Sequence, residues 1–333
     1  MERYIAIDNV CAWPNLTTMP GGDIIATIFN QPTHGGWEGD VERWSGGTDG
    51  RFWTLRGVPA PHEPTTNRMN VAAGCARDGS LVVLASGWSK RNPVGDYSSP
   101  HKGEVLPMWV CRSEDAGQTW THAETIKAPS DNEAIIPFGD VVQLSDGTLG
   151  VSVYGWTSEG KCASYFYSSD DDGRTWAIRS TISPTEANET ALVTLNDGRI
   201  LAAVRRTGGA HMDMFISDDN GATWRGVGPV SLPSQHPGHL LELADGRILL
   251  TMGLRNRGYR GIGVRSSSDR GETWGAPIFL VELRGAGDLG YPASVQTADG
   301  TIVTAYYCDG ITEHTRYHMG VMRWTLDENG NVK

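Results

Sequence analysis

Basic residues are scarce in this chain of 333 residues. It has 28 lysines and arginines against 39 acidic residues, which gives a formal net charge of −11. A nucleic acid or an anionic membrane surface is bound by a basic face, so we expect neither partner. Any anionic ligand would then be held by a few local arginines.

Long apolar runs are also missing. No run approaches the roughly 20 residues of a membrane span. The opening MERYIAIDNV lacks the charged-then-apolar form of a signal peptide. We therefore expect a cytoplasmic protein, or a secreted or periplasmic one if a leader has been removed.

Cysteines are few, and their spacing is uninformative. The five are scattered, odd in number and without C-x-x-C spacing. In a chain of this length such cysteines are expected to be reduced, buried and inert. We expect no metal site and no cofactor.

Glycine and tryptophan are plentiful: there are 42 glycines, and 12 tryptophans against only 6 phenylalanines. Part of this excess comes from a repeated box, S-x-D-x-G-x-T-W. Its serine and aspartate can hydrogen-bond the turn backbone, and its tryptophan can plug the sheet beneath. A calcium loop would need a completing glutamate that the boxes lack, so we interpret them as structural turns. The copies are SEDAGQTW (113–120), SDDDGRTW (169–176), SDDNGATW (217–224), SSDRGETW (267–274) and a decayed GGTDGRFW (46–53).

A second repeat alternates with the boxes and consists of an apolar strand, an Asp-Gly turn and another apolar strand. Asp-Gly between alternating apolar runs predicts a hairpin, because glycine accepts positive φ. The turns fall at Asp78-Gly79, Asp146-Gly147, Asp197-Gly198, Asp245-Gly246 and Asp299-Gly300, with Gly21-Gly22 as a weaker first copy.

Together the two repeats predict an all-β fold, a six-bladed β-propeller with four-stranded antiparallel blades, over a single domain, 1–333. Radial closure of such blades leaves only short sheet edges. The opening YIAIDNV would supply the outer strand of the last blade, beside HMGVMRW (318–324).

Strand side chains alternate between faces, so residues eight and six before each turn aspartate share one face. These positions combine polar with small or apolar residues, which predicts a polar site at one end of the propeller axis. The alternative is a water-filled channel lined by satisfied polar groups. The positions are Trp13/Asn15, Asn70/Ala72, Phe138/Asp140, Glu189/Ala191, Pro237/His239 and Tyr291/Ala293. Among them Asn70, Asp140 and His239 are candidates for substrate binding.

With the boxes, the segments NETALVTLNDGRILAAVRR (188–206), RGIGVRSSSDRGETW (260–274) and GYPASVQTADGTIVTAYY (290–307) resemble the sialidase superfamily of six-bladed propellers. The resemblance covers nearly the whole chain. It implies a tyrosine nucleophile at Tyr291 and an assisting glutamate at Glu189. It also implies carboxylate-binding arginines at Arg205 and Arg260.

The chain departs from this family at two places. The strand CAWPNLTTMPGGD has Ala12 near the position where the family keeps the arginine of an R-I-P motif. The acid/base residue is ambiguous, because the loop HGGWEGDVER (34–43) offers His34, Glu38 and Asp40 without the family's spacing. Arg257, in GLRNRGYRG (253–261), is a further candidate for substrate binding.

The resemblance implies an exo-acting, retaining glycoside hydrolase on an anionic glycan, either sialic-acid-like or containing a uronic acid. A tyrosine suits a sialic acid, because the carboxylate on the anomeric carbon of that sugar would repel a carboxylate nucleophile. Two other functions remain open. One is a lyase in which a tyrosine or histidine removes a proton beside a uronate carboxylate, and the other is a carbohydrate-binding propeller without catalysis. The residues also have structural alternatives: Tyr291 as a strand cap, Glu189 with Arg205 as an ion pair, and Arg255, Arg257 and Arg260 in a solvated basic turn.

Overall fold

The computed structural model describes residues 1–89, 103–130, 134–157, 159–208, 211–284, 288–310, 315–328 and 330–333. Its regular elements in these residues are all β-strands, so the all-β prediction is confirmed. Among the same residues, no helix is long and apolar enough to cross a membrane.

Four of the sheets have four strands each, and neighbouring strands in them are antiparallel. The first contains β2 (Cys11–Thr18), β3 (Ile24–Phe29), β4 (Val41–Ser45) and β5 (Thr54–Ala60). The second contains β14 (Ala187–Thr194), β15 (Ile200–Arg206), β16 (Met212–Ser217) and β17 (Arg225–Pro229). The third contains β18 (Gln235–Glu242), β19 (Ile248–Asn256), β20 (Tyr259–Ser267) and β21 (Ile278–Glu282). The fourth contains β22 (Leu289–Gln296), β23 (Ile302–Asp309), β24 (Tyr317–Trp324) and β1 (Glu2–Asp8).

The remaining eight strands form one sheet, which differs from the prediction of six separate blades. It joins β6 (Thr66–Cys75), β7 (Leu81–Ser89), β8 (Trp109–Ser113) and β9 (Thr121–Ala123) to β10 (Ile135–Gln143), β11 (Leu149–Trp156), β12 (Cys162–Ser169) and β13 (Ala177–Ser183).

The junction is a short parallel contact of β6 with β10, in which Ala72 lies opposite Gly139 and Ala73 opposite Asp140. Small residues allow this close approach. A Cβ on Gly74 would lie 2.2 Å from the carbonyl oxygen of Val141.

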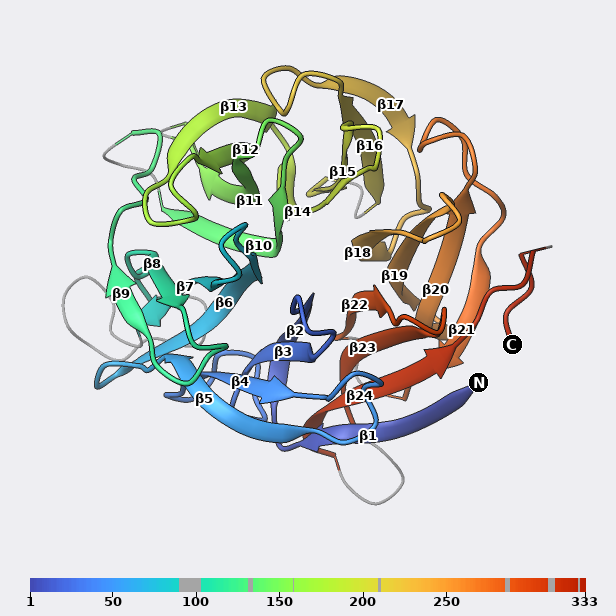
Figure 1. Ribbon diagram of the computed structural model, residues 1–333, viewed down its shortest axis with the longest axis horizontal. Coiled ribbons are helices and arrows are strands. Elements are labelled where there is room, and N and C mark those ends of the chain that lie inside the picture. The colour runs from blue at the N-terminus through green and yellow to red at the C-terminus, as the bar shows by residue number, and fades with distance from the viewer. Residues whose placement is uncertain are drawn as a thin grey trace.

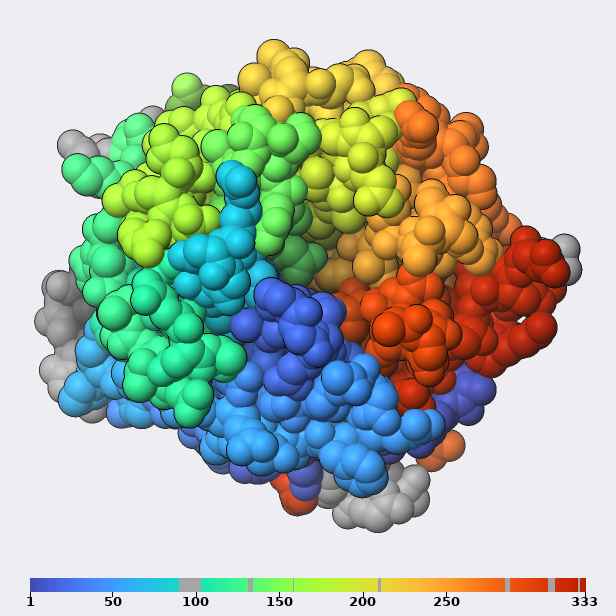
Figure 2. Space-filling model, viewed as in Figure 1, coloured from blue at the N-terminus to red at the C-terminus, as the bar shows by residue number. Residues whose placement is uncertain are grey.

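The sheets stand around a common axis in a propeller-like arrangement (Figure 1). The inner strands β2, β6, β10, β14, β18 and β22 contact one another in this order, and β22 contacts β2. The ring is closed by β1, which pairs with β24 as predicted. Figure 2 shows the surface from the same side, with a recess near the axis.

Both repeats form the predicted turns. The glycines of the five Asp-Gly turns, together with Gly22, have φ between +84° and +91°. In one box, the Ser169 hydroxyl donates to Asp171 and accepts the Gly173 N–H, while Trp176 Nε1 donates to the Gly173 carbonyl at 3.0 Å. The box residues therefore satisfy one another, as the sequence predicts.

The five cysteines are unpaired. Cys11, Cys111 and Cys308 are buried as expected, but Cys75 and Cys162 are half-buried, so full burial is wrong for these two. Burial raises the pKa of the Cys75 thiol to about 11.

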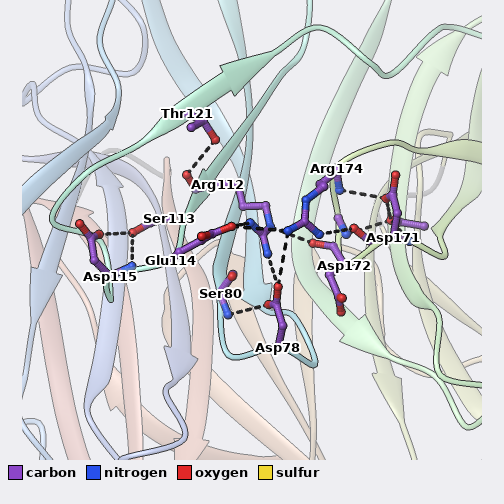
Figure 3. Close-up of polar contacts among 12 residues, drawn as sticks. Asp78, Ser80, Arg112, Ser113, Glu114, Asp115, Thr121, Asp171, Asp172 and Arg174 are labelled. Atoms are coloured by element: carbon purple, nitrogen blue, oxygen red, sulfur yellow. Dashed lines mark hydrogen bonds and ion pairs between the residues drawn. The ribbon is translucent and has the colours of Figure 1, made fainter.

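A charged cluster holds the two halves of the eight-stranded sheet together (Figure 3). The buried guanidinium of Arg112 on β8 binds Asp78 of the β6–β7 turn and Glu114 of its own box. It also donates to the Asp172 carbonyl of the next box at 3.2 Å. Arg174 of that box reaches back to Glu114 at 3.4 Å.

We expect Arg112→Ala to lower the free energy of unfolding by about 1–3 kcal/mol, because it leaves Asp78 and a carbonyl without their buried donor. Urea denaturation measures the change. Arg225→Ala, which removes an exposed pair with Glu272, is the matched control and should have no measurable effect. Equal losses in the two variants would contradict the role given to Arg112.

Candidate active site

The candidate site lies where the inner strands lose their regular pairing, at the ends away from the Asp-Gly turns. Five of the six inner strands have a register shift there, whereas in β10 the shift lies nearer the turn, between Phe138 and Val142. Such bulges re-aim side chains. In β22 the shift falls between Gly290 and Ala293, and Tyr291 between them has φ +46°. This conformation costs a non-glycine residue about 1–2 kcal/mol, so surrounding contacts must hold it.

Tyr291, Glu189 and Arg205 form one connected group. The Tyr291 hydroxyl donates to Glu189 Oε1 at 2.6 Å, and Arg205 Nη1 donates to Glu189 Oε2 at 2.7 Å. Arg205 Nη1 also lies 3.3 Å from the Tyr291 oxygen. Tyr291 and Glu189 are each only 5% exposed. The structure thus brings together three residues that the sequence analysis selected from two distant segments.

The environment keeps the Tyr291 phenol protonated. Burial raises its pKa well above the usual value, and the negative charge of Glu189 raises it further, against the opposing charges of Arg205 and Arg255. The Tyr291 proton is therefore held toward Glu189, which is the acceptor placed to receive it.

The second arginine beside Tyr291 is Arg255, at the end of β19. Its guanidinium carbon lies 5.2 Å from the Tyr291 ring centroid, and its Nε donates to the Leu289 carbonyl at 3.0 Å. Nearby, His236 has its pKa lowered to about 3 by burial and by the charges of Arg205 and Arg255. Arg205 is paired with Glu189, and Arg255 Nη2 lies 3.9 Å from Asp288 Oδ1, so each arginine has a carboxylate beside it. His236 adds no charge at neutral pH.

The sequence analysis selected Arg260 and Arg257 from this segment rather than Arg255. Arg260 lies opposite Arg255 on β20, one strand further from the axis, and Arg257 is exposed in the turn between the strands. A spacing argument could have found Arg255. It stands ten residues after the turn residue Asp245, near the position that Arg205 takes after Asp197.

An aromatic wall closes the opposite side of Tyr291. The Trp13 ring is stacked on the Tyr291 ring, with centroids 4.4 Å apart and 9° between the planes. The rings of Phe138 and Tyr307 also lie beside the Tyr291 ring, with centroid distances of 6.1 and 5.6 Å. Ala12 is fully buried in this cluster, so the wall is apolar at the place where the family resemblance implies an arginine.

Four buried nitrogens around Tyr291 lack a hydrogen-bond partner within the described part of the chain. They are Trp13 Nε1, Arg205 Nε, His236 Nδ1 and Arg255 Nη2. Buried polar atoms are normally satisfied, so a cluster of unsatisfied nitrogens indicates a place where a polar ligand or water is bound.

His34 lies beside the wall and is held by Asp288, a residue that the sequence analysis did not select. His34 Nδ1 lies 2.6 Å from Asp288 Oδ2, and its ring meets Trp13 edge-on at 5.2 Å. Tyr307 and Tyr317 donate to Asp288 at 2.7 and 2.8 Å. Burial tends to raise the pKa of Asp288. The bonds from His34 and the two tyrosines outweigh burial and hold this pKa well below its usual value.

Asp40, the other acid/base candidate, forms a separate pair. Its Oδ1 accepts the His62 backbone N–H at 2.8 Å and lies 2.6 Å from His62 Nδ1, while Glu38 lies 3.7 Å from His62 Nε2. The structure therefore joins His34, but not Asp40, to the wall around Tyr291 through described contacts.

Asp140 and His239 bind each other on the axis. His239 Nε2 lies 3.0 Å from Asp140 Oδ2, and Asn15 Nδ2 donates to Asp140 Oδ1 at 2.9 Å. His239 Nδ1 accepts the Ser294 N–H at 3.3 Å, which places the ring proton on Nε2. Asn70 is buried against Ser86, so these polar groups are satisfied internally.

This axial layer alternates around the ring. Asn15, Asp140 and His239 come from β2, β10 and β18, and the intervening inner strands contribute alanines, namely Ala72, Ala191 and Ala293. The cavity beside the layer measures about 20 Å³, room for about one water molecule. This layer thus fits the alternative of polar groups that satisfy one another rather than bind a ligand. Tyr291 and Glu189 do not belong to the layer.

We expect Asp140→Ala to lower the free energy of unfolding by about 1–3 kcal/mol, because it leaves buried donors of Asn15 and His239 unsatisfied. Thermal and urea denaturation check this. Asp218→Ala, at an exposed box position, is the control. An unchanged midpoint for Asp140→Ala would show that the axial layer does not stabilise the ring.

Comparison with known proteins now places the chain in a family. It matches the BNR repeat-like domain over residues 59–304. The chain belongs to this family. No functionally curated protein sequence matches it.

Solved structures share the fold. A protein of unknown function from Dyadobacter fermentans DSM 18053 is 21% identical, with a TM-score of 0.81 over 96% of this chain and 97% of that one. The Hadza microbial sialidase Hz136 is 18% identical, with a TM-score of 0.71 over 95% of this chain and 66% of that one. Trypanosoma rangeli sialidase is 15% identical, with a TM-score of 0.72 over 94% of this chain and 55% of that one. The chain thus spans less than two thirds of the length of either sialidase.

Proposed function

We propose that the protein is an exo-acting glycoside hydrolase on an anionic glycan, retaining the anomeric configuration through a covalent intermediate on Tyr291. The observation that carries the proposal is the 2.6 Å hydrogen bond from the Tyr291 hydroxyl to Glu189, buried beside two arginines. We further count the eight-stranded sheet as two blades, which makes the propeller six-bladed.

In the first step the Tyr291 oxygen attacks the anomeric carbon while its proton passes to Glu189. His34 protonates the departing glycosidic oxygen, so the bond to the leaving group breaks without releasing an alkoxide. In the second step His34 takes a proton from water, which attacks the anomeric carbon. The Tyr291–glycosyl bond breaks as the water oxygen bonds to the anomeric carbon, and the tyrosine recovers its proton from Glu189.

The substrate's anionic group is assigned to Arg205 and Arg255. Guanidinium groups suit carboxylates because they offer planar pairs of N–H donors, and each of these two retains one unsatisfied buried nitrogen. Ala12 in place of a third arginine leaves a clamp of two, which is compatible with a sialic acid or with a uronic acid.

Structures with the same fold support this chemistry by analogy. Trypanosoma rangeli sialidase has been solved with sialic acid and, as a covalent intermediate, with 2,3-difluorosialic acid. Both of these structures are of the Trypanosoma rangeli protein. They show that the shared fold can form a glycosyl–enzyme bond.

A uronate lyase is the second candidate, and the His34–Asp288 pair favours it as an alternative. A histidine held by a carboxylate can act as a base, and the arginines can neutralise a uronate carboxylate. Elimination leaves an unsaturated uronate that absorbs in the near ultraviolet, whereas hydrolysis does not. A propeller that only binds carbohydrate would give saturable binding and neither product.

We expect Tyr291→Phe to lower kcat at least about a thousandfold on sialosides or uronic-acid oligosaccharides, because it removes the attacking oxygen. Chromatographic product analysis on both substrate classes measures the loss. Tyr259→Phe, at an exposed tyrosine, is the matched control. Full turnover by Tyr291→Phe would exclude the covalent mechanism.

We expect His34→Ala to lower kcat by about 10²–10⁴-fold on glycosides with sugar leaving groups, but far less on nitrophenyl glycosides, which depart without protonation. Asp288→Asn should lower kcat on the same glycosides, because Asp288 holds the His34 ring in place through Nδ1. Asp40→Asn is the control and should leave the dependence on the leaving group unchanged. Equal losses on both substrates would exclude His34 as the general acid.

A further inference from the structure

We propose that a second carbohydrate-binding site adjoins Tyr291, between β11–β12 and the start of β14, and that it binds a neutral sugar linked to the anionic one. This inference rests on the proposed function for the position of the anionic sugar. The surface pocket has a volume of about 560 Å³, and its lining includes Trp156, Lys161, Cys162, Thr185, Glu186 and Thr207.

A series of side-chain contacts links the pocket to the candidate site. Trp156 meets Tyr154 edge-on at 6.0 Å, and Tyr154 is buried in the aromatic cluster that contains Tyr291. Cys162 lies opposite Trp156 in the β11–β12 pair and packs against the same cluster. The negative charge of Glu189 adds to burial in raising the pKa of Cys162. The two sites are therefore neighbours.

The order of the sheets shows which part of a substrate would reach the pocket. His34 lies at the β2–β22 boundary, beside Trp13 and Asp288. Since the inner strands follow one another in chain order, the β10–β14 boundary is on the opposite side of the ring. The leaving group would depart near His34, so this pocket faces the end of the sugar away from the cleaved bond.

The lining indicates a neutral sugar ring. Lys161 pairs with Glu159 at 2.7 Å, and Glu186 lies 3.8 Å from Arg206, so the charged groups are balanced. Trp156 is 38% exposed and lines the pocket, so part of its indole ring is open to a ligand. An indole ring can pack against the C–H face of a pyranose while the Thr185 and Thr207 hydroxyls bind its hydroxyl groups.

A substrate that fills both sites has a neutral sugar on the non-reducing side of the anionic residue. The enzyme would then act from a chain end and release a disaccharide, with the anionic sugar at its reducing end. A single anionic sugar would leave Trp156 uncovered.

Calorimetric titration of the Tyr291→Phe protein with cellobiose, xylobiose and lactose tests the site directly, because this variant removes the proposed turnover. We expect at least one disaccharide to bind with a Kd below about 10 mM. Adding Trp156→Ala should weaken that binding about tenfold or more, and adding Trp156→Phe should preserve most of it. Tyr259→Phe in the same background is the control for an aromatic change elsewhere.

Absence of binding for all three sugars, or equal binding with and without Trp156, would overturn the second site. These outcomes are separate from those for the hydrolase. Binding that depends on Trp156 in a protein that cleaves nothing would uphold the site and reject the hydrolase. Cleavage of sialosides or uronides without such binding would uphold the hydrolase and reject the second site.

Discussion

Closure of the ring is the constraint on which the site depends. The β1–β24 pairing joins the first residues of the chain to the last sheet, and β22 then contacts β2. Trp13 lies on β2 and His34 in the β3–β4 loop, whereas Tyr291 lies on β22 and Asp288 directly before it. The stack of Trp13 on Tyr291 and the pairing of His34 with Asp288 both cross this seam. The arrangement around Tyr291 thus requires the complete propeller.

Within the closed ring, chemistry and stability use different layers of the same strands. The layer on the axis satisfies its own polar groups, and the layer above it, around Tyr291, leaves buried nitrogens unsatisfied. Bulges in the inner strands separate these layers by turning side chains out of the regular alternation. A strained Tyr291 backbone is tolerated there because aromatic packing and Glu189 hold the ring.

Much of this arrangement could be predicted from the sequence, because it repeats. Counting back from each Asp-Gly turn placed Tyr291 and Glu189 on one face, and the boxes predicted the strands between. Arg255 was missed because the choice among three arginines depends on where β19 ends. Asp288 precedes β22 in a segment that belongs to neither repeat, so counting back from the Asp-Gly turns did not identify it. The mutual binding of Asp140 and His239, and the β6–β10 contact beside Gly74, depend on distances across the closed ring that strand periodicity does not contain.

The axial layer also limits the passage of a ligand along the propeller axis. Asn15, Asp140 and His239 meet where an open propeller would have a tunnel, and the remaining space holds about one water molecule. A sugar therefore cannot pass from one face of the disc to the other along this layer. Under the proposed function, a product held at Arg205 and Arg255 would have to leave by the face at which the substrate entered, so its release would add to the time of each cycle.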